Sequence, residues 1–175
     1  MKSKSIKLVL ASIAMLMALA SCAAPANLAQ APPFTLTDIK GNQVSLADFK
    51  GQKAVLLMFF NYQVGTGQDP VMQSYLAYYQ GMDKLQILSI INRGNLPEEM
   101  KQYMAGQAQQ IPGGLGFATP LRDEDGSVSQ AFNASPDKLT IVLVDRDGDI
   151  RFRQEVTSLA ETNRDLAQQV EKLTK

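Results

Sequence analysis

Three predominantly apolar segments stand along the chain, the first of them uninterrupted, and each predicts a buried β-strand. The runs cover residues 54–60, 85–91 and 139–145. An apolar run without polar alternation is typical of a strand that is covered on both faces of a sheet. Helical patterns lie between the first and second runs and after the second. This alternation predicts an α/β domain in which helices cover a central sheet.

Shorter alternating segments predict two hairpins. Residues 34–37 and 43–46 flank the turn sequence Asp38–Asn42, which predicts an N-terminal β-hairpin, and residues 47–51 then form a helical turn that a glycine closes. Residues 150–156 follow an aspartate-rich turn. They predict a strand that returns along the third apolar run.

Helices complete the expected pattern. Asp69 and Pro70 supply an N-cap and a proline at the first helical position of a helix that reaches Gly81. Further helices are expected over 97–109, 127–132 and 159–174. Candidate core contacts of the last helix are Leu159, Val170 and Leu173. The whole pattern predicts three layers, with helices on both faces of the sheet.

The first 22 residues predict an export signal that ends in a lipid-attachment site. Three lysines precede an apolar run of 13 residues, Leu8–Ala20, whereas a membrane span needs about 20 residues. The run fits the apolar region of a secretory signal peptide. The four residues Leu19-Ala20-Ser21-Cys22 resemble the lipobox of bacterial lipoproteins. That resemblance implies cleavage before Cys22, a diacylglycerol on its thiol and an acyl chain such as palmitate on its amine. An ordinary signal peptide with an incidental cysteine, or a core helix, is the alternative.

Three parts are therefore expected: a signal peptide over 1–21, the lipidated cysteine with an Ala/Pro-rich tether over 22–33, and a domain over 34–175. The eleven tether residues 23–33 reach at most about 40 Å. By resemblance to enterobacterial sorting, Ala23 after the cysteine favours the outer membrane facing the periplasm. Without an outer membrane, the place is the outer face of the plasma membrane.

Composition excludes many kinds of chemistry. The 175 residues include one cysteine and no histidine, so neither a Ser-His-Asp triad, nor a His-ligated metal, nor an internal disulfide is available. The formal net charge is zero, which argues against a nucleic-acid partner. Without the three lysines of the signal, 14 basic and 17 acidic side chains remain, a formal charge of −3. Membrane attachment then rests on the acyl chains.

Three stretches carry a resemblance to a known family. They are residues 31–51, the strand 55–60 and the strand with its Asp-rich turn, 139–148. Together they resemble the redoxin branch of the thioredoxin fold, which comprises alkyl hydroperoxide reductase/thiol-specific antioxidant proteins and membrane-anchored thiol-disulfide oxidoreductases. The resemblance covers about residues 31–175. It implies a thioredoxin-like three-layer α/β fold with a central mixed sheet and an N-terminal β-hairpin.

The sequence departs from this family where the family's chemistry is carried. In the redoxins a CxxC motif follows the first central strand, at a helix start that lowers the thiol pKa. Counting from Phe60, its two cysteines fall on Val64 and Gly67, and the peroxidatic cysteine of peroxiredoxins falls near Gln68. None of these positions holds a thiol.

The second half of the family's site is missing as well. The cis-proline that faces the thiols of thioredoxins falls on Leu139, or on Lys138 in a shifted alignment, while Pro136 stands three residues early. Cys22 lies ahead of the domain, and lipidation consumes its sulfur. We expect no catalytic residue, no cofactor and no metal.

These observations predict a redox-inactive domain that binds or scaffolds a protein partner in the bacterial envelope. By position in the family, the candidate contact surface comprises the loop 61–68 and the facing turn 136–139. Its candidate residues are Asn61, Tyr62, Gln63, Thr66, Pro136 and Lys138. The alternatives are an oxidoreductase or antioxidant enzyme that uses Cys22 or a partner's thiol, and a carrier of a metal or small molecule.

Minor candidate sites have simpler interpretations. Asp145–Asp149 resembles the opening of a calcium loop, but the twelfth position is valine rather than glutamate, so a plain turn is expected. Met100 and Met104 share a helix face and are expected to fill the core rather than to bind copper(I). The strip of tyrosines Tyr75, Tyr78 and Tyr79 is expected to pack in the core, with a partner surface as the alternative.

Overall fold

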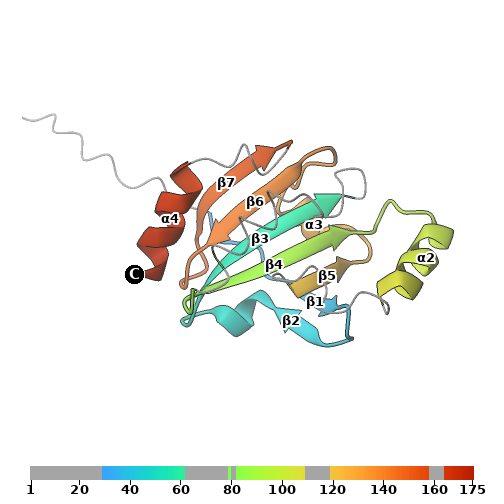
Figure 1. Ribbon diagram of the computed structural model, residues 1–175, viewed down its shortest axis with the longest axis horizontal. Coiled ribbons are helices and arrows are strands. Elements are labelled where there is room, and N and C mark those ends of the chain that lie inside the picture. Colours follow the sequence, from blue (N-terminus) through green and yellow to red (C-terminus); the bar gives the residue numbers. More distant parts are fainter. Residues whose placement is uncertain (1–28, 62–78, 80–81, 109–118, 158–163) are drawn as a thin grey trace, which may run out of the picture.

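The computed structural model describes residues 29–61, 79, 82–108, 119–157 and 164–175 (Figure 1). Within these ranges the strands are β1 (Thr35–Asp38), β2 (Gln43–Ser45), β3 (Ala54–Asn61), β4 (Leu85–Asn92), β5 (Thr119–Asp123), β6 (Leu139–Val144) and β7 (Ile150–Val156). The helices are the 3₁₀ turn η1 (Leu46–Phe49) and the α-helices α2 (Glu98–Ala108), α3 (Ser127–Ala131) and α4 (Arg164–Thr174).

The strands form one mixed sheet in the order β2-β1-β5-β4-β3-β6-β7. Strands β3, β4 and β5 run parallel, and β6 pairs antiparallel with β3. Strands β1 and β2 form the expected N-terminal hairpin, with Leu36 opposite Val44. The mixed sheet and the hairpin confirm the predicted fold class.

Alternating residues of β3 divide the core between the two faces of the sheet. Leu56 and Met58 belong to one apolar cluster, which also contains Leu166 and Val170 of α4. Leu57 and Phe59 belong to a second cluster, in which Leu46 of η1 and Phe132 after α3 take part. Because successive side chains of a strand point to opposite faces, the clusters lie on opposite faces of the sheet. Helices therefore cover both faces, and the three predicted layers are present.

Strand β5 was not predicted from the sequence. Its residues Thr119–Asp123 include Pro120 and Arg122, and they show neither an apolar run nor a clear alternation. The strand nevertheless lies between β4 and β1, with Leu121 opposite Ile90 and close to Asp38. Pro120 lies outside the short ladder with β1, which begins at Leu121. Tertiary pairing thus overrides a local sequence that disfavours a strand.

The helix predictions agree with the structure wherever it describes them. Helix α2 confirms the segment expected over 97–109, and Val170 is completely buried while Leu173 packs against the same cluster. Leu166, also completely buried, was missed. Of the helix expected over 70–81, only Tyr79 is described, and its side chain is buried as predicted. Leu159 lies outside the described residues. Met104 belongs to α2, but its side chain is not described.

The end of the predicted tether belongs to the folded domain. The Ala31 N–H donates to the Gly148 carbonyl at 2.9 Å, and the Ile150 N–H donates to the Ala29 carbonyl at 3.1 Å. Gln30 forms an isolated antiparallel bridge with Asp149 between these two bonds. The expectation that the tether continues to Pro33 is therefore corrected. The fold already holds the chain at Ala29, because backbone groups of the β6–β7 turn provide hydrogen-bond partners there.

Candidate functional site

The described part of the predicted contact surface, Asn61 and the turn before β6, lies at the carboxyl end of β3. Asn61, the last residue of β3, pairs with Asn92 of β4, and Phe59 pairs antiparallel with Thr140 of β6. Continuing this antiparallel register brings the segment before β6 next to the end of β3. Asn61 and the turn 136–138 therefore lie at the same end of the sheet.

The turn before β6 presents polar and charged residues to solvent. Pro136, Asp137 and Lys138 are exposed. Two hydrogen bonds fix the backbone of the turn. The Ser135 N–H donates to Thr140 Oγ1 at 2.9 Å, and the Asp137 N–H donates to Ser135 Oγ at 3.3 Å. Pro136 and Lys138 are therefore available for contact.

Leu139 occupies a different environment from its neighbours in the turn. Its side chain is only 2% exposed and packs in the cluster that contains Val156 and Leu166. The described residues contain no cis peptide bond, so neither Pro136 nor the start of β6 reproduces the cis-proline of thioredoxins. The prediction that the contact surface extends to residue 139 is therefore wrong, because the Leu139 side chain packs in the core.

The other candidate positions lie outside the described residues. They are Cys22, Tyr62, Gln63, Val64, Thr66, Gly67 and Gln68, and the side chain of Asn61 is likewise not described.

Arg93 is a buried charge beside this edge that sequence reasoning missed. It directly follows β4, and its side chain is 7% exposed. Nη1 donates to Glu124 Oε1 and Nη2 donates to the Lys101 carbonyl, each at 2.8 Å. The guanidinium therefore joins the end of β4 to α2 and to the residue after β5. Burying a charge is costly unless it is paired, and these bonds supply the pairing.

Asp123, at the end of β5, anchors helix α3. It is completely buried, and Oδ2 accepts hydrogen bonds from the N–H and from Oγ of Ser129, both at 2.7 Å. Oδ1 accepts a longer bond, 3.3 Å, from the Val128 N–H. The N-cap residue of this helix, Gly126, has no side chain, so Asp123 satisfies the free N–H groups of the first turn in its place.

The loop after β4 and the loop after β5 are in close contact at Gly94 and Asp125. A methyl group on Gly94 would lie 2.5 Å from the carbonyl oxygen of Asp125, a distance at which backbone has to move. Asn92 supports the contact, because its Oδ1 accepts from the Gly94 N–H at 2.9 Å. The position therefore requires glycine for steric reasons, and the loop after β4 is fixed to the loop after β5.

The aspartate-rich turn between β6 and β7 is a structural turn rather than a cation site. Oδ1 of Asp145 accepts from the N–H groups of Asp147 and Asp149, both at 2.9 Å, and Oδ2 accepts from Arg151 Nε. Burial raises the pKa of Asp145, but these hydrogen bonds and the positive charge of Arg151 outweigh it and hold the pKa below 3.8. Both oxygens of this carboxylate therefore face donors.

The described residues contain no group of three or more acidic, cysteine or histidine side chains able to hold a metal ion. Among them, no helix is long and apolar enough to cross a membrane. Residues 23–175 contain neither cysteine nor histidine. The hydroxyl of Ser129 is buried and donates to the Asp123 carboxylate, which also accepts from the backbone of α3. The described residues around the edge fix loops and present a surface.

Comparison with protein families decides the relationship. The model of the AhpC/TSA family matches residues 28–153. The chain belongs to the AhpC/TSA family. The match begins next to Ala29, where the structure shows the chain docked on the β6–β7 turn, and it includes every strand from β1 to β6. No curated protein sequence matches the chain significantly.

Solved structures similar to this AhpC/TSA domain are thioredoxin-like. A thiol:disulfide interchange protein DsbE of Chlorobium tepidum is 23% identical, with 85% of this chain and 97% of that one covered and a TM-score of 0.60. The exposed lipoprotein thioredoxin Etrx1 of Streptococcus pneumoniae is 16% identical, with 81% and 100% covered and a TM-score of 0.63. The thioredoxin domain of a Bacteroides vulgatus thiol-disulfide oxidoreductase is 23% identical, with 87% and 100% covered and a TM-score of 0.56. These likenesses establish the thioredoxin-like fold.

Proposed function

We propose that this AhpC/TSA protein is a lipid-anchored envelope protein whose domain binds a partner protein without thiol chemistry. One observation carries the proposal: the only cysteine, Cys22, precedes the folded domain, and residues 29–175 contain no thiol and no imidazole. Thiol-disulfide exchange requires a thiolate, and a peroxidase of this family likewise requires one.

The geometry supports a contact role at the family's usual binding edge. Pro136 and Lys138 are exposed beside the end of β3, while Ser135 and Thr140 hold the turn in place from behind. Arg93 and Asp123 fix the neighbouring loops through buried hydrogen bonds. A rigid, exposed and chemically unreactive edge is suited to binding, because little order has to be gained on association.

The competing function is that of the named neighbours, two of which are described as thiol-disulfide exchange proteins. It requires a thiol from a partner or from an unacylated Cys22. Reduction of insulin and turnover of hydrogen peroxide by the mature protein test this function, with a CxxC thioredoxin as the positive control. We expect background rates in both assays. Turnover above background that persists in Cys22→Ser overturns the proposal.

Acylation and partner binding have separate tests. Mass spectrometry of the protein purified from membranes is expected to show cleavage before Cys22 and acyl chains on that residue, and a free thiol in full yield contradicts the anchor. Crosslinking from the turn, with a photoreactive residue at Lys138, is expected to capture a specific envelope protein. The same residue placed at Gln168, an exposed position on α4, is the control. Equal capture from both positions contradicts the proposed contact surface.

A further inference from the structure

The path of the chain fixes which end of the domain lies near the proposed anchor. The carbonyl of Ala29 and the N–H of Ala31 are bonded to Ile150 and Gly148 in the β6–β7 turn. Seven residue steps separate Ala29 from Cys22. They reach at most about 25 Å when fully extended. If Cys22 carries acyl chains, as the proposed function requires, the β6–β7 turn stays within this distance of the bilayer surface.

The starts of β3 and β4 lie at the same end of the sheet as this turn. The N–H of Gly51, before β3, donates to the Arg146 carbonyl at 2.8 Å, and the Ala54 N–H donates to the Lys84 carbonyl at 2.9 Å. The last turn of α4 also reaches this end, because Arg146 Nη2 donates to the Leu173 carbonyl at 3.1 Å. We call this the basal end. Strand β3 then runs eight residues away from it to Asn61, a distance of about 23 Å.

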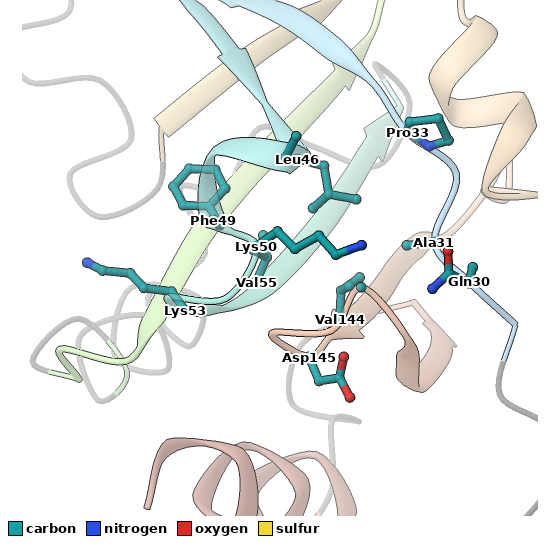
Figure 2. A pocket seen from close by; sticks show the side chains of 12 residues that line it. Gln30, Ala31, Pro33, Leu46, Phe49, Lys50, Lys53, Val55, Val144 and Asp145 are labelled. Carbon is teal, nitrogen blue, oxygen red and sulfur yellow. The ribbon is translucent and has the colours of Figure 1, made fainter.

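The basal end carries two lysines beside a small apolar cavity. The cavity has a volume of about 230 Å³, and its apolar wall includes Leu46, Val55 and Val144. Figure 2 shows the Lys50 side chain running across the cavity toward Ala31, while the Lys53 side chain extends to the opposite side. A lysine stem covers apolar surface in this way while its ammonium remains in water.

Neither lysine is neutralised by a carboxylate of the described residues, although Asp145 also lines the cavity. Both oxygens of Asp145 accept hydrogen bonds from the turn and from Arg151, so its charge is already paired. Exposed carboxylates near the basal end include Asp48, Asp83, Asp147 and Glu171. Glu171 is paired with Lys175 at 2.7 Å, and Lys84 Nζ donates to the Lys175 carbonyl at 2.6 Å.

Exposed acidic residues follow β4 and β5 at the opposite end of the sheet: Glu98, Glu99, Glu124 and Asp125. Glu124 is paired with Arg93 and Arg122, and Glu98 lies 4.0 Å from Lys101, so Glu99 and Asp125 are the acidic residues of this set without a basic partner among the described residues. An acidic bilayer attracts basic residues and repels acidic ones within about a Debye length of its surface. The two lysines beside the cavity and the path of the chain therefore favour the same orientation.

We propose that Lys50 and Lys53 bind the headgroups of acidic phospholipids in the membrane that holds Cys22, so that the basal end faces the bilayer. The edge formed by Asn61 and the turn 136–138 then points away from the membrane, toward soluble or membrane-distant partners.

Site-specific spin labels test this orientation in the acylated full-length mature protein. Acylation leaves no free thiol in the chain, so one introduced cysteine is a unique attachment point. Gln52→Cys places a label at the basal end and Asp137→Cys places one at the opposite end; both positions are exposed. The protein is reconstituted in phosphatidylcholine vesicles with and without phosphatidylglycerol, and a nickel-chelating lipid reports how close each label lies to the membrane.

We expect strong relaxation of the Gln52 label and weak relaxation of the Asp137 label in phosphatidylglycerol vesicles, and a smaller difference in pure phosphatidylcholine or at high salt. Removing both charges by Lys50→Gln and Lys53→Gln is expected to abolish the preference. Each lysine is expected to change the ratio of the two orientations by about fivefold. Arginine at both positions should preserve it, and Lys138→Gln is the matched control. Equal relaxation of the two labels, or a preference unchanged by the double glutamine variant, overturns the proposal. Mass spectrometry of the same sample shows separately whether Cys22 is acylated.

Discussion

Ser129 donates two hydrogen bonds to one carboxylate oxygen of Asp123, from its backbone N–H and from Oγ, each 2.7 Å long. Both residues are buried, Asp123 completely. The pair joins the last residue of β5, a strand that was not predicted from the sequence, to the first turn of α3. The position of α3 beside the proposed contact edge depends on these two hydrogen bonds.

Removing the Asp123 carboxylate should therefore destabilise the domain. Asp123→Ala leaves the N–H groups of Val128 and Ser129 and the Ser129 hydroxyl without their acceptor, and an unsatisfied buried donor costs about 1–3 kcal/mol. We expect the free energy of unfolding in urea to fall by about 3 kcal/mol. Ser129→Ala, which removes one of the bonds, should cost about 1 kcal/mol. Equal small losses in both variants contradict the proposed anchoring role.

Gly94 should not tolerate a side chain. In Gly94→Ala the new methyl group meets the backbone of Asp125 at 2.5 Å, so one of the two loops has to move. Overpacking of this kind costs about 1–3 kcal/mol. Gly41→Ala is the matched comparison, because its φ of 91° is strained for alanine but nothing lies within 4 Å of the new methyl group. Thermal unfolding should show the larger loss for Gly94→Ala, and the opposite order contradicts the close contact.

Acid should weaken the domain partly through Asp145. Its folded-state pKa lies below 3.8, because the hydrogen bonds from the turn and Arg151 outweigh the effect of burial. A carboxyl group with a lowered folded-state pKa contributes stability above its unfolded pKa and loses it as the pH falls through the folded value. The free energy of unfolding, measured in urea between about pH 6 and pH 2, should therefore decline below about pH 4.

Substitution of the carboxylate should flatten that decline. Asp145→Asn is expected to be less stable at neutral pH and to lose less stability on acidification than the wild type. Arg151→Gln removes the positive partner but keeps the hydrogen bonds from Asp147 and Asp149, so its profile should lie between the two. A decline of the same size in Asp145→Asn and the wild type shows that other carboxyl groups dominate.

Helix α4 should stabilise the fold through Leu166. The side chain is completely buried in the cluster that contains Leu143 and Val170. Leu166→Ala removes buried methyl groups and leaves a cavity, for which we expect a loss of about 2–5 kcal/mol. Gln168→Ala, on the exposed side of the same helix, should change the free energy of unfolding by less than about 0.5 kcal/mol. A loss below about 1 kcal/mol for Leu166→Ala means that α4 packs only weakly against the sheet.

The local patterns were most informative where burial is complete. Strands β3, β4 and β6 are predominantly apolar, and such segments have few alternatives to the centre of a sheet. The hairpin β1–β2 and helix α2 follow from turn residues and helix-start signals in the same way. The absent thiols and imidazoles are read directly from the sequence, because no folding step supplies a missing functional group.

The contact edge was predicted by its position in the family rather than by local chemistry. The register between Phe59 and Thr140 brings the turn 136–138 next to the end of β3. Short-range sequence patterns do not predict which of these distant segments pair. Leu139, one residue later, turns into the core instead. Arg93 was missed because an isolated arginine after a strand gives no signal until its partners, Glu124 and the Lys101 carbonyl, have been brought to it.

The sequence by itself determined which chemistry is missing, where a lipid anchor is expected and which segments form the centre of the sheet. It could do so because composition and the periodicity of apolar residues are properties of the chain alone. Only the tertiary structure decided that β5 is a strand, that Asp123 caps α3 and that Ala29–Ala31 belong to the domain. The pairing of β5 and the docking of Ala29–Ala31 depend on hydrogen bonds between residues distant in sequence, and such bonds exist only once the sheet has assembled. The bonds of Asp123 to Val128 and Ser129 are local, but no residue pattern indicated that Asp123 would cap the helix.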